Sequence, residues 1–282
     1  MKRHIRWTLV LACISSLTTW PQDTFASNDP LPAVGARAVG LGYAYTAMRG
    51  DIWSLFHNPA GITGSNSVQV GVYLEQRFLL KELSYGHAGA IFPIFKNQAA
   101  GVEISSFGFD AYRENLAAVS YGITVLDKIS VGAKLAYANL NIPGYGAAGT
   151  VLVQMGAHTQ INSQLSLGVS AFNVNRATFL TQGRREILPS HLTAGLAYQP
   201  TDKVLVVVDV QKALEFPVSF RGGIEYQLHE ILYARIGVST EPLTLTGGLG
   251  VNWKQIKVDF SSSYTERLGY TPHISLSYGF GG

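Results

Sequence analysis

Six histidines of the chain lie beyond residue 26, and they are the side chains best suited to acid–base or metal chemistry. They are spread singly, and none lies beside a serine or paired carboxylates in an arrangement suited to nucleophilic catalysis. No two of them have the spacing of a zinc site. The only cysteine, Cys13, lies in the N-terminal apolar segment, so neither a disulfide framework nor a thiol nucleophile is expected. We therefore expect no catalytic residue, no metal site and no cofactor; the histidines are His57, His87, His158, His191, His229 and His273.

The composition of the chain excludes several classes of protein. Only 14% of the 282 residues are charged and the formal net charge is +3, so the concentrated basic face of a nucleic-acid-binding protein is missing. Beyond residue 20, no run of roughly 18 apolar residues could form a transmembrane helix. With 47% hydrophobic residues, the chain is not disordered. Low charge, 30 glycines and many aromatic residues are typical of a membrane β-barrel.

The first 26 residues have the order of a secretory signal peptide. Basic residues at positions 2, 3 and 6 precede an apolar stretch over 7–17, and small residues at 24 and 26 precede a cleavage point at Ser27. The alternatives are a buried first helix and a lipoprotein signal ending at Cys13, which would leave too short an apolar core. We expect 1–26 to be removed as a signal peptide.

Apolar and polar residues alternate through almost all of the sequence after residue 67, as in strands with one apolar face. Most of the fourteen such runs are close to the 9–11 residues that a tilted strand needs to cross a bilayer. An even number is typical of single-chain bacterial barrels. The expected strands are about 68–78, 83–93, 98–109, 113–125, 128–140, 149–161, 164–173, 190–200, 203–211, 217–228, 231–240, 243–253, 256–265 and 272–280.

The links between these runs add a second signal. Links after even-numbered runs are short, as at 126–127 and 229–230, whereas the longer links 141–148, 174–189 and 266–271 follow odd-numbered runs. Outer-membrane barrels have short periplasmic turns and longer outer loops, a parity that a soluble sandwich or jelly roll does not explain. We therefore expect an all-β fold, a 14-stranded antiparallel outer-membrane β-barrel with an N-terminal plug. It would lie in the bacterial outer membrane, in contact with its lipid, with both termini periplasmic.

If the apolar residues face lipid, the residues of the other parity face the lumen. A turn centred on Glu230 would place Glu225 opposite Arg235 on the inner face, where such pairs tie neighbouring strands together. The inward charges balance, which does not indicate ion selectivity, and we interpret them as wall pairs rather than a substrate site. The expected lumen-facing charges are Glu103, Lys134, Asp209, Arg221, Glu225, Arg235, Lys257 and Asp259.

A ring of fourteen strands is wider than the barrels whose own side chains fill the interior. Residues 27–67 show no sustained alternation and precede the first strand, so we expect them to plug a barrel of residues 68–282. An Asn-Pro turn would lead the plug into the first strand, with Asn58 buried and hydrogen-bonded. Trp53 and Phe56 are expected to pack against the wall or within the plug.

Residues 35–62 resemble the N-terminal stretch of the PorV/PorQ family and of its wider relatives, the FadL-type fatty-acid channels. In those families a glycine- and alanine-rich segment with an acidic residue leads to Asn-Pro-Ala before the first strand. The resemblance implies a fourteen-stranded outer-membrane barrel with an N-terminal plug, which the alternation also indicates. The matching residues are Gly40, Gly42, Asp51, Asn58, Pro59, Ala60 and Gly61.

The last expected strand resembles the C-terminal signal that the barrel assembly machinery of the outer membrane reads. Apolar residues alternate with small ones up to a near-terminal aromatic residue. The resemblance implies that this machinery is a partner of the chain. The signal residues are Ile274, Leu276, Tyr278 and Phe280.

The family resemblance implies two non-enzymatic functions. PorV/PorQ relatives serve type IX protein secretion, where they bind the translocon or the C-terminal sorting domains of cargo. FadL-type channels take up fatty acids or other hydrophobic compounds through long outer loops that form an apolar capture groove. The longest link here, 174–189, is polar, with Arg176, Arg184, Arg185 and Glu186. We therefore expect a docking partner in secretion; a FadL-like channel for a hydrophobic small molecule is the alternative, and no nucleic-acid partner is expected.

Overall fold

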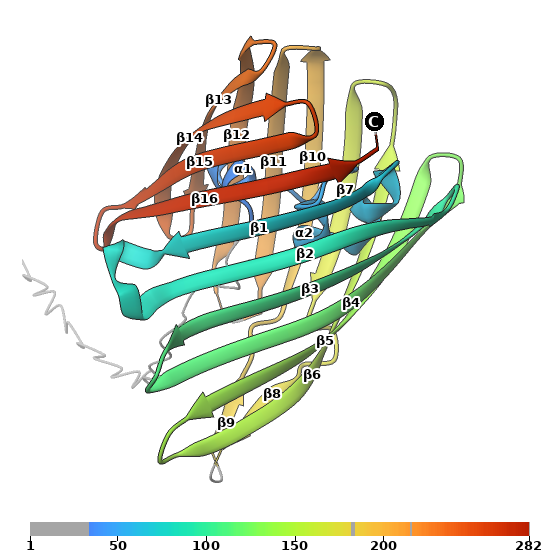
Figure 1. Ribbon diagram of the computed structural model, residues 1–282. Helices are drawn as coiled ribbons and strands as arrows, with labels where there is room; N and C mark the ends of the chain where they lie inside the picture. The colour runs from blue at the N-terminus through green and yellow to red at the C-terminus, as the bar shows by residue number, and fades with distance from the viewer. Residues whose placement is uncertain (1–33, 182–183, 215, 282) are drawn as a thin grey trace, which may run out of the picture.

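The computed structural model describes residues 34–181, 184–214 and 216–281, and within these ranges the chain forms a closed antiparallel β-barrel (Figure 1). The expected signal peptide and residues 27–33 of the expected plug lie outside the described residues. In the described ranges, no helix combines the length and the apolar character needed to cross a membrane. The ring has fourteen strands, which confirms the expected fold class.

The barrel strands follow one another around the ring in sequence order, and the first pairs with the last. Two further short strands, β8 (Thr178–Thr181) and β9 (Arg184–Ile187), form a hairpin between β7 and β10. The barrel strands are β1 (Val68–Gln76), β2 (Ser84–Phe95), β3 (Gln98–Phe109), β4 (Tyr112–Leu126), β5 (Ile129–Ile142), β6 (Gly146–Gln160), β7 (Leu165–Phe172), β10 (His191–Thr201), β11 (Val204–Ala213), β12 (Val218–His229), β13 (Leu232–Thr240), β14 (Leu243–Trp253), β15 (Ile256–Thr265) and β16 (Gly269–Phe280).

All fourteen expected strands are present, and their ends differ from the expected ones by a few residues. The link expected at 141–148 is shorter, because β5 and β6 remain paired up to Ile142 and Gly146. Ladder hydrogen bonds join backbone groups, so strands continue through small residues that break the apolar alternation. The link expected at 266–271 shortens for the same reason, since Thr265 pairs with Gly269. The β8–β9 hairpin was not expected.

The outer surface of the barrel is apolar. Leu135, Leu249 and Phe260 are 53%, 54% and 53% exposed, whereas Ser130 and Ser261, of the other parity, are fully buried on the inner side. Every barrel strand carries exposed large apolar residues, as in barrels whose outer band contacts lipid. The residues of the expected assembly signal also face outward: Ile274, Leu276, Tyr278 and Phe280.

The two ends of the barrel differ. At one end, here called the turn end, links of two to four residues join the strands and β16 finishes. At the other, here called the hairpin end, lie the β8–β9 hairpin and the helical turns η2 (Arg77–Leu79) and η3 (Lys81–Leu83) between β1 and β2. The longest links therefore share one end, although most links at that end are as short as those at the turn end.

The described N-terminal residues form an inner segment, residues 34–64, which lies inside the ring of strands. It contains α1 (Ala36–Gly40), α2 (Ser54–His57) and the 3₁₀ helix η1 (Pro59–Gly64), which leads to β1. Figure 1 shows α1 and α2 behind the front strands β16 and β1. Trp53 is 2% exposed and packs in an apolar core that also includes Tyr73 and Ile91 of the wall, with Phe56 packed against it.

Candidate functional site in the barrel interior

The Asn-Pro turn holds the inner segment against β6. Asn58 is fully buried, and its Nδ2 donates to the carbonyl oxygens of Thr46 at 2.8 Å and Ala157 at 3.0 Å. Its Oδ1 accepts from the amide of Ala60 at 3.1 Å. A Cβ on Gly156 of the wall would lie 2.0 Å from this Oδ1, so the contact requires glycine at that position. One amide side chain therefore joins two parts of the segment to the wall.

Gly42, in the first half of the motif, lies in close backbone contact with the wall. Gly42 has a φ of 67°, and a Cβ there would lie 2.3 Å from the carbonyl oxygen of Gly222 in β12. Only glycine combines that backbone conformation with that contact. The remaining small motif residues are buried in the same segment: Gly40, Pro59, Ala60 and Gly61.

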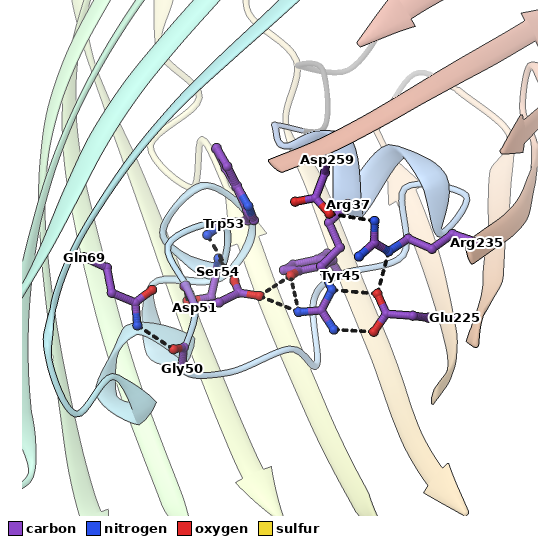
Figure 2. A network of polar contacts seen from close by, with 10 residues as sticks. All are labelled: Arg37, Tyr45, Gly50, Asp51, Trp53, Ser54, Gln69, Glu225, Arg235 and Asp259. Atoms are coloured by element: carbon purple, nitrogen blue, oxygen red, sulfur yellow. Dashed lines mark hydrogen bonds and ion pairs between the residues drawn. The ribbon is translucent and has the colours of Figure 1, made fainter. Parts of the chain in front are cut away.

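A row of ion pairs links the inner segment to β12, β13 and β15 (Figure 2). Arg37 of α1 contacts Asp51 of the segment at 2.8 Å and Glu225 of β12 at 2.7 Å. Arg235 of β13 contacts the same Glu225 at 2.5 Å and Asp259 of β15 at 2.7 Å. Glu225 lies directly opposite Arg235 in the strand register, as the turn at Glu230 predicted. Each carboxylate has a cationic partner, and removing one cation would leave a buried charge unpaired.

Two aspartates position the loop between α1 and α2. The Asp51 carboxylate accepts from two backbone amides at the start of α2 and from the hydroxyl of Tyr45. Asp209 of β11 accepts from the backbone amides of Tyr45 and Thr46 at 3.0 Å and from the Thr46 hydroxyl at 2.7 Å. Arg37, Tyr45 and Thr46 were not among the expected site residues, because no local pattern in the sequence marks them as partners of wall residues far along the chain.

All eight charges expected in the lumen lie on the inner side of the wall. Glu103 and Lys134 form a buried ion pair at 2.8 Å. Arg221 and Lys257 line cavities on opposite sides of the inner segment. The structure therefore divides the eight charges among four places: the ion-pair row, the Glu103–Lys134 pair, the loop anchored by Asp209, and the cavity walls with Arg221 and Lys257.

The inner segment separates two cavities. The cavity at the turn end measures about 250 Å³ and is polar, with Arg37, Asp51 and Lys257 among its lining residues. On the hairpin side of the segment lies a cavity of about 80 Å³, here called the middle cavity, with Phe56 and His57 on its wall. Among the described residues, none lines both cavities. The segment therefore stands between them.

A third cavity, here called the outer cavity, lies between the middle cavity and the hairpin end. It measures about 40 Å³. Tyr85, Ser105, Leu116 and Phe172 line both the outer and the middle cavity, so the two are neighbours. Most of the other residues around the outer cavity are apolar or aromatic and come from β5, β6 and the link between β7 and β10: Ala138, Leu152, Phe179, Leu188 and Pro189.

The expectation that the 174–189 link is too polar for a hydrophobic ligand is wrong for its inner face. Phe179 is 2% exposed and Ala177 8% exposed, whereas Arg185 is exposed. Side chains of a strand alternate between two faces, so a polar segment can still present an apolar surface inward. In the same region, inward residues of β4 to β6 form an apolar cluster on the lumen side of the wall: Ala118, Ala136, Ala138, Leu140 and Leu152.

The structure brings three of the scattered histidines to the middle cavity: His57 of α2, His87 of β2 and His191 of β10. Nε2 of His57 donates to the carbonyl oxygen of Val34 at 3.0 Å. Burial lowers the pKa of His57, which belongs to the inner segment, to about 4, so its imidazole is neutral at pH 7. In the described part of the chain, no three His, Cys, Asp or Glu residues are grouped to hold a metal ion.

No protein-family model and no curated protein matches the sequence. Solved structures share its fold: the CymD monoaromatic hydrocarbon channel has a TM-score of 0.67 and 15% identity, over 89% of this chain and 98% of that one. The toluene transporter TbuX of Ralstonia pickettii has a TM-score of 0.66 and 15% identity, over 88% and 98%. A FadL homologue of Pseudomonas aeruginosa has a TM-score of 0.66 and 11% identity, over 89% and 99%.

These likenesses concern the fold. They agree with the wider, FadL-type part of the resemblance at residues 35–62 and give no support to its PorV/PorQ part. The proteins named are a channel, a transporter and a FadL homologue, so they do not support the expected role in protein secretion. The chain has the barrel fold of FadL-type outer-membrane channels.

Proposed function

We propose that the protein is an outer-membrane barrel that admits a small hydrophobic molecule from its hairpin end, with the inner segment as the plug below. The outer cavity carries this proposal, because aromatic and branched apolar side chains line it. Ser105, Glu114 and Asn115 also line this cavity, but apolar side chains outnumber them, whereas polar or charged groups would dominate the wall of a pore for ions. The fold likeness to a hydrocarbon channel and a toluene transporter supports the same ligand class.

The arrangement of the interior supports a binding step before any passage. The outer and middle cavities are neighbours on one side of the inner segment, and the polar cavity lies on the other. A molecule entering at the hairpin end would first meet apolar walls and then the segment. The ion-pair row and Asn58 hold that segment in place, so onward movement requires some of these contacts to break.

A tryptophan that fills the outer cavity tests the proposal. Ala138 lines that cavity, whereas Ala133 lies on the same strand and faces outward. We expect Ala138→Trp to lower the uptake of labelled toluene by bacteria on the order of tenfold, because the indole is larger than the space available. Ala133→Trp, the matched control, should keep the uptake of the unmodified protein. Unchanged uptake by a folded Ala138→Trp barrel would contradict the proposal; gel mobility without boiling checks folding.

A docking role in protein secretion is the second candidate, and the motif at residues 35–62 is the observation that favours it. Purification of the intact protein from outer membranes separates the two candidates. Retained secretion components would favour docking. A bound small apolar compound without protein partners would favour the channel.

A further inference from the structure

The outward face of β3, β4 and β5 changes from apolar to polar toward the hairpin end. In β5, Leu135 and Tyr137 are exposed on the lipid-facing side, whereas the next two outward residues along the strand carry amide side chains. The same change occurs in β4 and β3, at the same level of the wall. The polar residues that share this face, here called the outer polar patch, are Ser106, Arg113, Asn115, Asn139 and Asn141.

The strand register brings these five residues together. Arg113 lies directly opposite Asn141, and Asn115 lies between Ser106 on one neighbouring strand and Asn139 on the other. Residues directly opposite each other in an antiparallel pair have Cβ atoms about 4.5–5.5 Å apart. The patch is therefore one continuous surface, although its members are spread over three strands.

Alternation along β4 decides the direction of Asn115, which is also among the residues around the outer cavity. Glu114 and Leu116, on either side of it, line the same cavity, and side chains of a strand alternate between two faces. Asn115 is exposed, as are Arg113 and Ala117 of the same parity. The backbone of Asn115 therefore borders the cavity, while its side chain belongs to the outer surface.

Strands β4 to β6 are longer than a bilayer requires. They have 15, 14 and 15 residues, whereas a tilted strand crosses with about 9–11. Tyr137 is the last outward residue of β5 before Asn139, and aromatic residues are common where the wall of a barrel leaves the hydrocarbon. The outer polar patch therefore lies just beyond the apolar band, at the level of the lipid head groups.

On the opposite side of the ring, outward polar residues at the hairpin end are isolated by apolar neighbours. Lys212 of β11 has Leu192 and Val218 beside it in register, and Thr240 of β13 lies opposite Leu243. These leucine and valine neighbours are all exposed. The patch is therefore a local feature of β3 to β5 and not part of a polar band that every strand carries.

Most hydrogen-bonding groups of the patch are unused within the protein. In the described part of the chain, the side chains of Asn115 and Asn141 have no hydrogen-bond partner. Nδ2 of Asn139 donates to one backbone carbonyl oxygen at 3.3 Å. Arg113 contacts Asp110 at 3.5 Å, an exposed pair of a kind that contributes little. The patch therefore offers a partner amides, which donate and accept, and a guanidinium group, which suits phosphate.

We propose that the outer polar patch binds the phosphorylated sugar head group of lipopolysaccharide in the outer leaflet of the membrane. Sugar hydroxyl groups donate and accept hydrogen bonds, as the three asparagine amides do, and Arg113 matches a phosphate group. The lipid-facing rows of the same strands adjoin the patch, so one lipid molecule places its acyl chains beside Leu135 and its head group on the patch. The inference rests on the proposed function only in placing the hairpin end outside the cell.

Removal of two patch side chains tests the proposal. The double variant Arg113→Leu/Asn141→Leu replaces a directly opposed pair by apolar side chains like those of other strands at this end. Labelled short-core lipopolysaccharide, titrated against the purified protein in detergent, measures the dissociation constant. We expect the variant to bind on the order of tenfold more weakly, because a charged and a neutral hydrogen bond are lost. Lys96→Leu/Asn97→Leu, the matched control, removes the same two kinds of group from the exposed β2–β3 turn and should change nothing.

Labelled phosphatidylglycerol, an anionic lipid without sugar rings, is the second probe. We expect the unmodified protein to bind lipopolysaccharide about fivefold more tightly than this lipid, and the double variant to lose the preference. Equal weakening of both lipids would overturn the inference, because the patch would then recognise charge alone. Unchanged binding of lipopolysaccharide by a folded double variant would overturn it as well; gel mobility without boiling checks folding. Retention of a protein by the patch, in place of lipopolysaccharide, would do the same.

Two further measurements separate this inference from the proposed function. Cys13 is the only cysteine and lies in the expected signal peptide, so Asn141→Cys supplies a unique thiol after cleavage. We expect a maleimide too large to cross the outer membrane to label it in intact cells; a folded barrel without labelling would place the hairpin end inside and overturn both proposals. Toluene uptake should be unchanged in Arg113→Leu/Asn141→Leu, because neither residue lines the outer or the middle cavity. Normal uptake together with unchanged lipopolysaccharide binding would overturn this inference alone.

Discussion

Arg37 joins the inner segment to the wall by charge as well as by packing. Its Nε and Nη2 donate to the two carboxylate oxygens of Glu225 at 2.9 and 2.7 Å, and Nη1 contacts Asp51. A guanidinium group makes such a paired contact because its donors lie in one plane, whereas a lysine ammonium cannot reproduce it. A single side chain thus connects the two halves of the segment with β12.

Replacement of Arg37 tests this connection. We expect Arg37→Met to lower the free energy of unfolding by about 3 kcal/mol and to raise ion conductance, because the buried Asp51 and Glu225 each lose a cation. Arg113→Met is the control, since Arg113 and Asp110 form an exposed pair at 3.5 Å and should contribute less than about 1 kcal/mol. Urea midpoints and planar-bilayer recordings measure the two effects. Identical behaviour of the two variants would show that Arg37 does not hold the segment.

At the scale of elements, two separate groups of strands present different side chains to the interior. Strands β14 to β16 present hydroxyl groups to α1: the Ser261 hydroxyl donates to the carbonyl of Ala36, and the Ser275 hydroxyl accepts from the Ala36 amide. Strands β4 to β6 present the apolar cluster that borders the outer cavity. The segment therefore binds the wall on both sides, through α1 at β15 and β16 and through Asn58 at β6, and space remains where β4 to β6 approach the hairpin end.

The surroundings of the two faces determine how much an introduced charge on β14 or β15 lowers the stability of the barrel. We expect Leu249→Arg, on the outer face, to cost roughly 2–4 kcal/mol in a bilayer, because lipid would surround the charge. The sequence alone predicts a milder effect for Ser261→Arg, but Ser261 is fully buried against α1, so we expect a loss of similar size. Leu249→Met should cost under about 1.5 kcal/mol. Urea unfolding in lipid vesicles measures all three, and a Ser261→Arg barrel as stable as the unmodified protein would show that this face is open to water.

At the scale of the whole molecule, the strand ladder that closes the wall does not use the backbone of the inner segment. The ladder between β1 and β16 closes the ring through backbone pairs from Val68↔Phe280 to Glu75↔His273, none of which involves the inner segment. A closed ring has no edge strand left unpaired. The barrel should therefore assemble without the segment, although its lumen would lose its apolar core.

Deletion of residues 34–64 tests whether the segment closes the lumen. We expect the shortened chain to form a heat-modifiable barrel with conductance on the order of tenfold above that of the intact protein, because a ring of fourteen strands is not filled by its own side chains. Planar bilayers and antibiotic sensitivity of cells provide the measurements. If the intact protein already conducts freely, the segment is not a plug. If the deleted form conducts no more than the intact one, other residues close the barrel.

The sequence by itself determined the strands, their number and their faces. Side-chain direction alternates with a fixed period of two, so residues such as Leu249 and Ser261 are assigned to opposite faces without any knowledge of the fold. The Asn-Pro turn was also visible, because it depends on neighbouring residues. These signals are local, and the lipid-facing surface makes them regular along the whole chain.

Only the tertiary structure decided which side chains meet inside. Arg37 and Glu225 are 188 residues apart, and His57, His87 and His191 come from three different elements. The hidden apolar face of the hairpin at Phe179 likewise depends on how that link folds over the lumen. Such contacts follow from closure of the ring and from its register, which bring distant residues together, so no spacing in the sequence could reveal them.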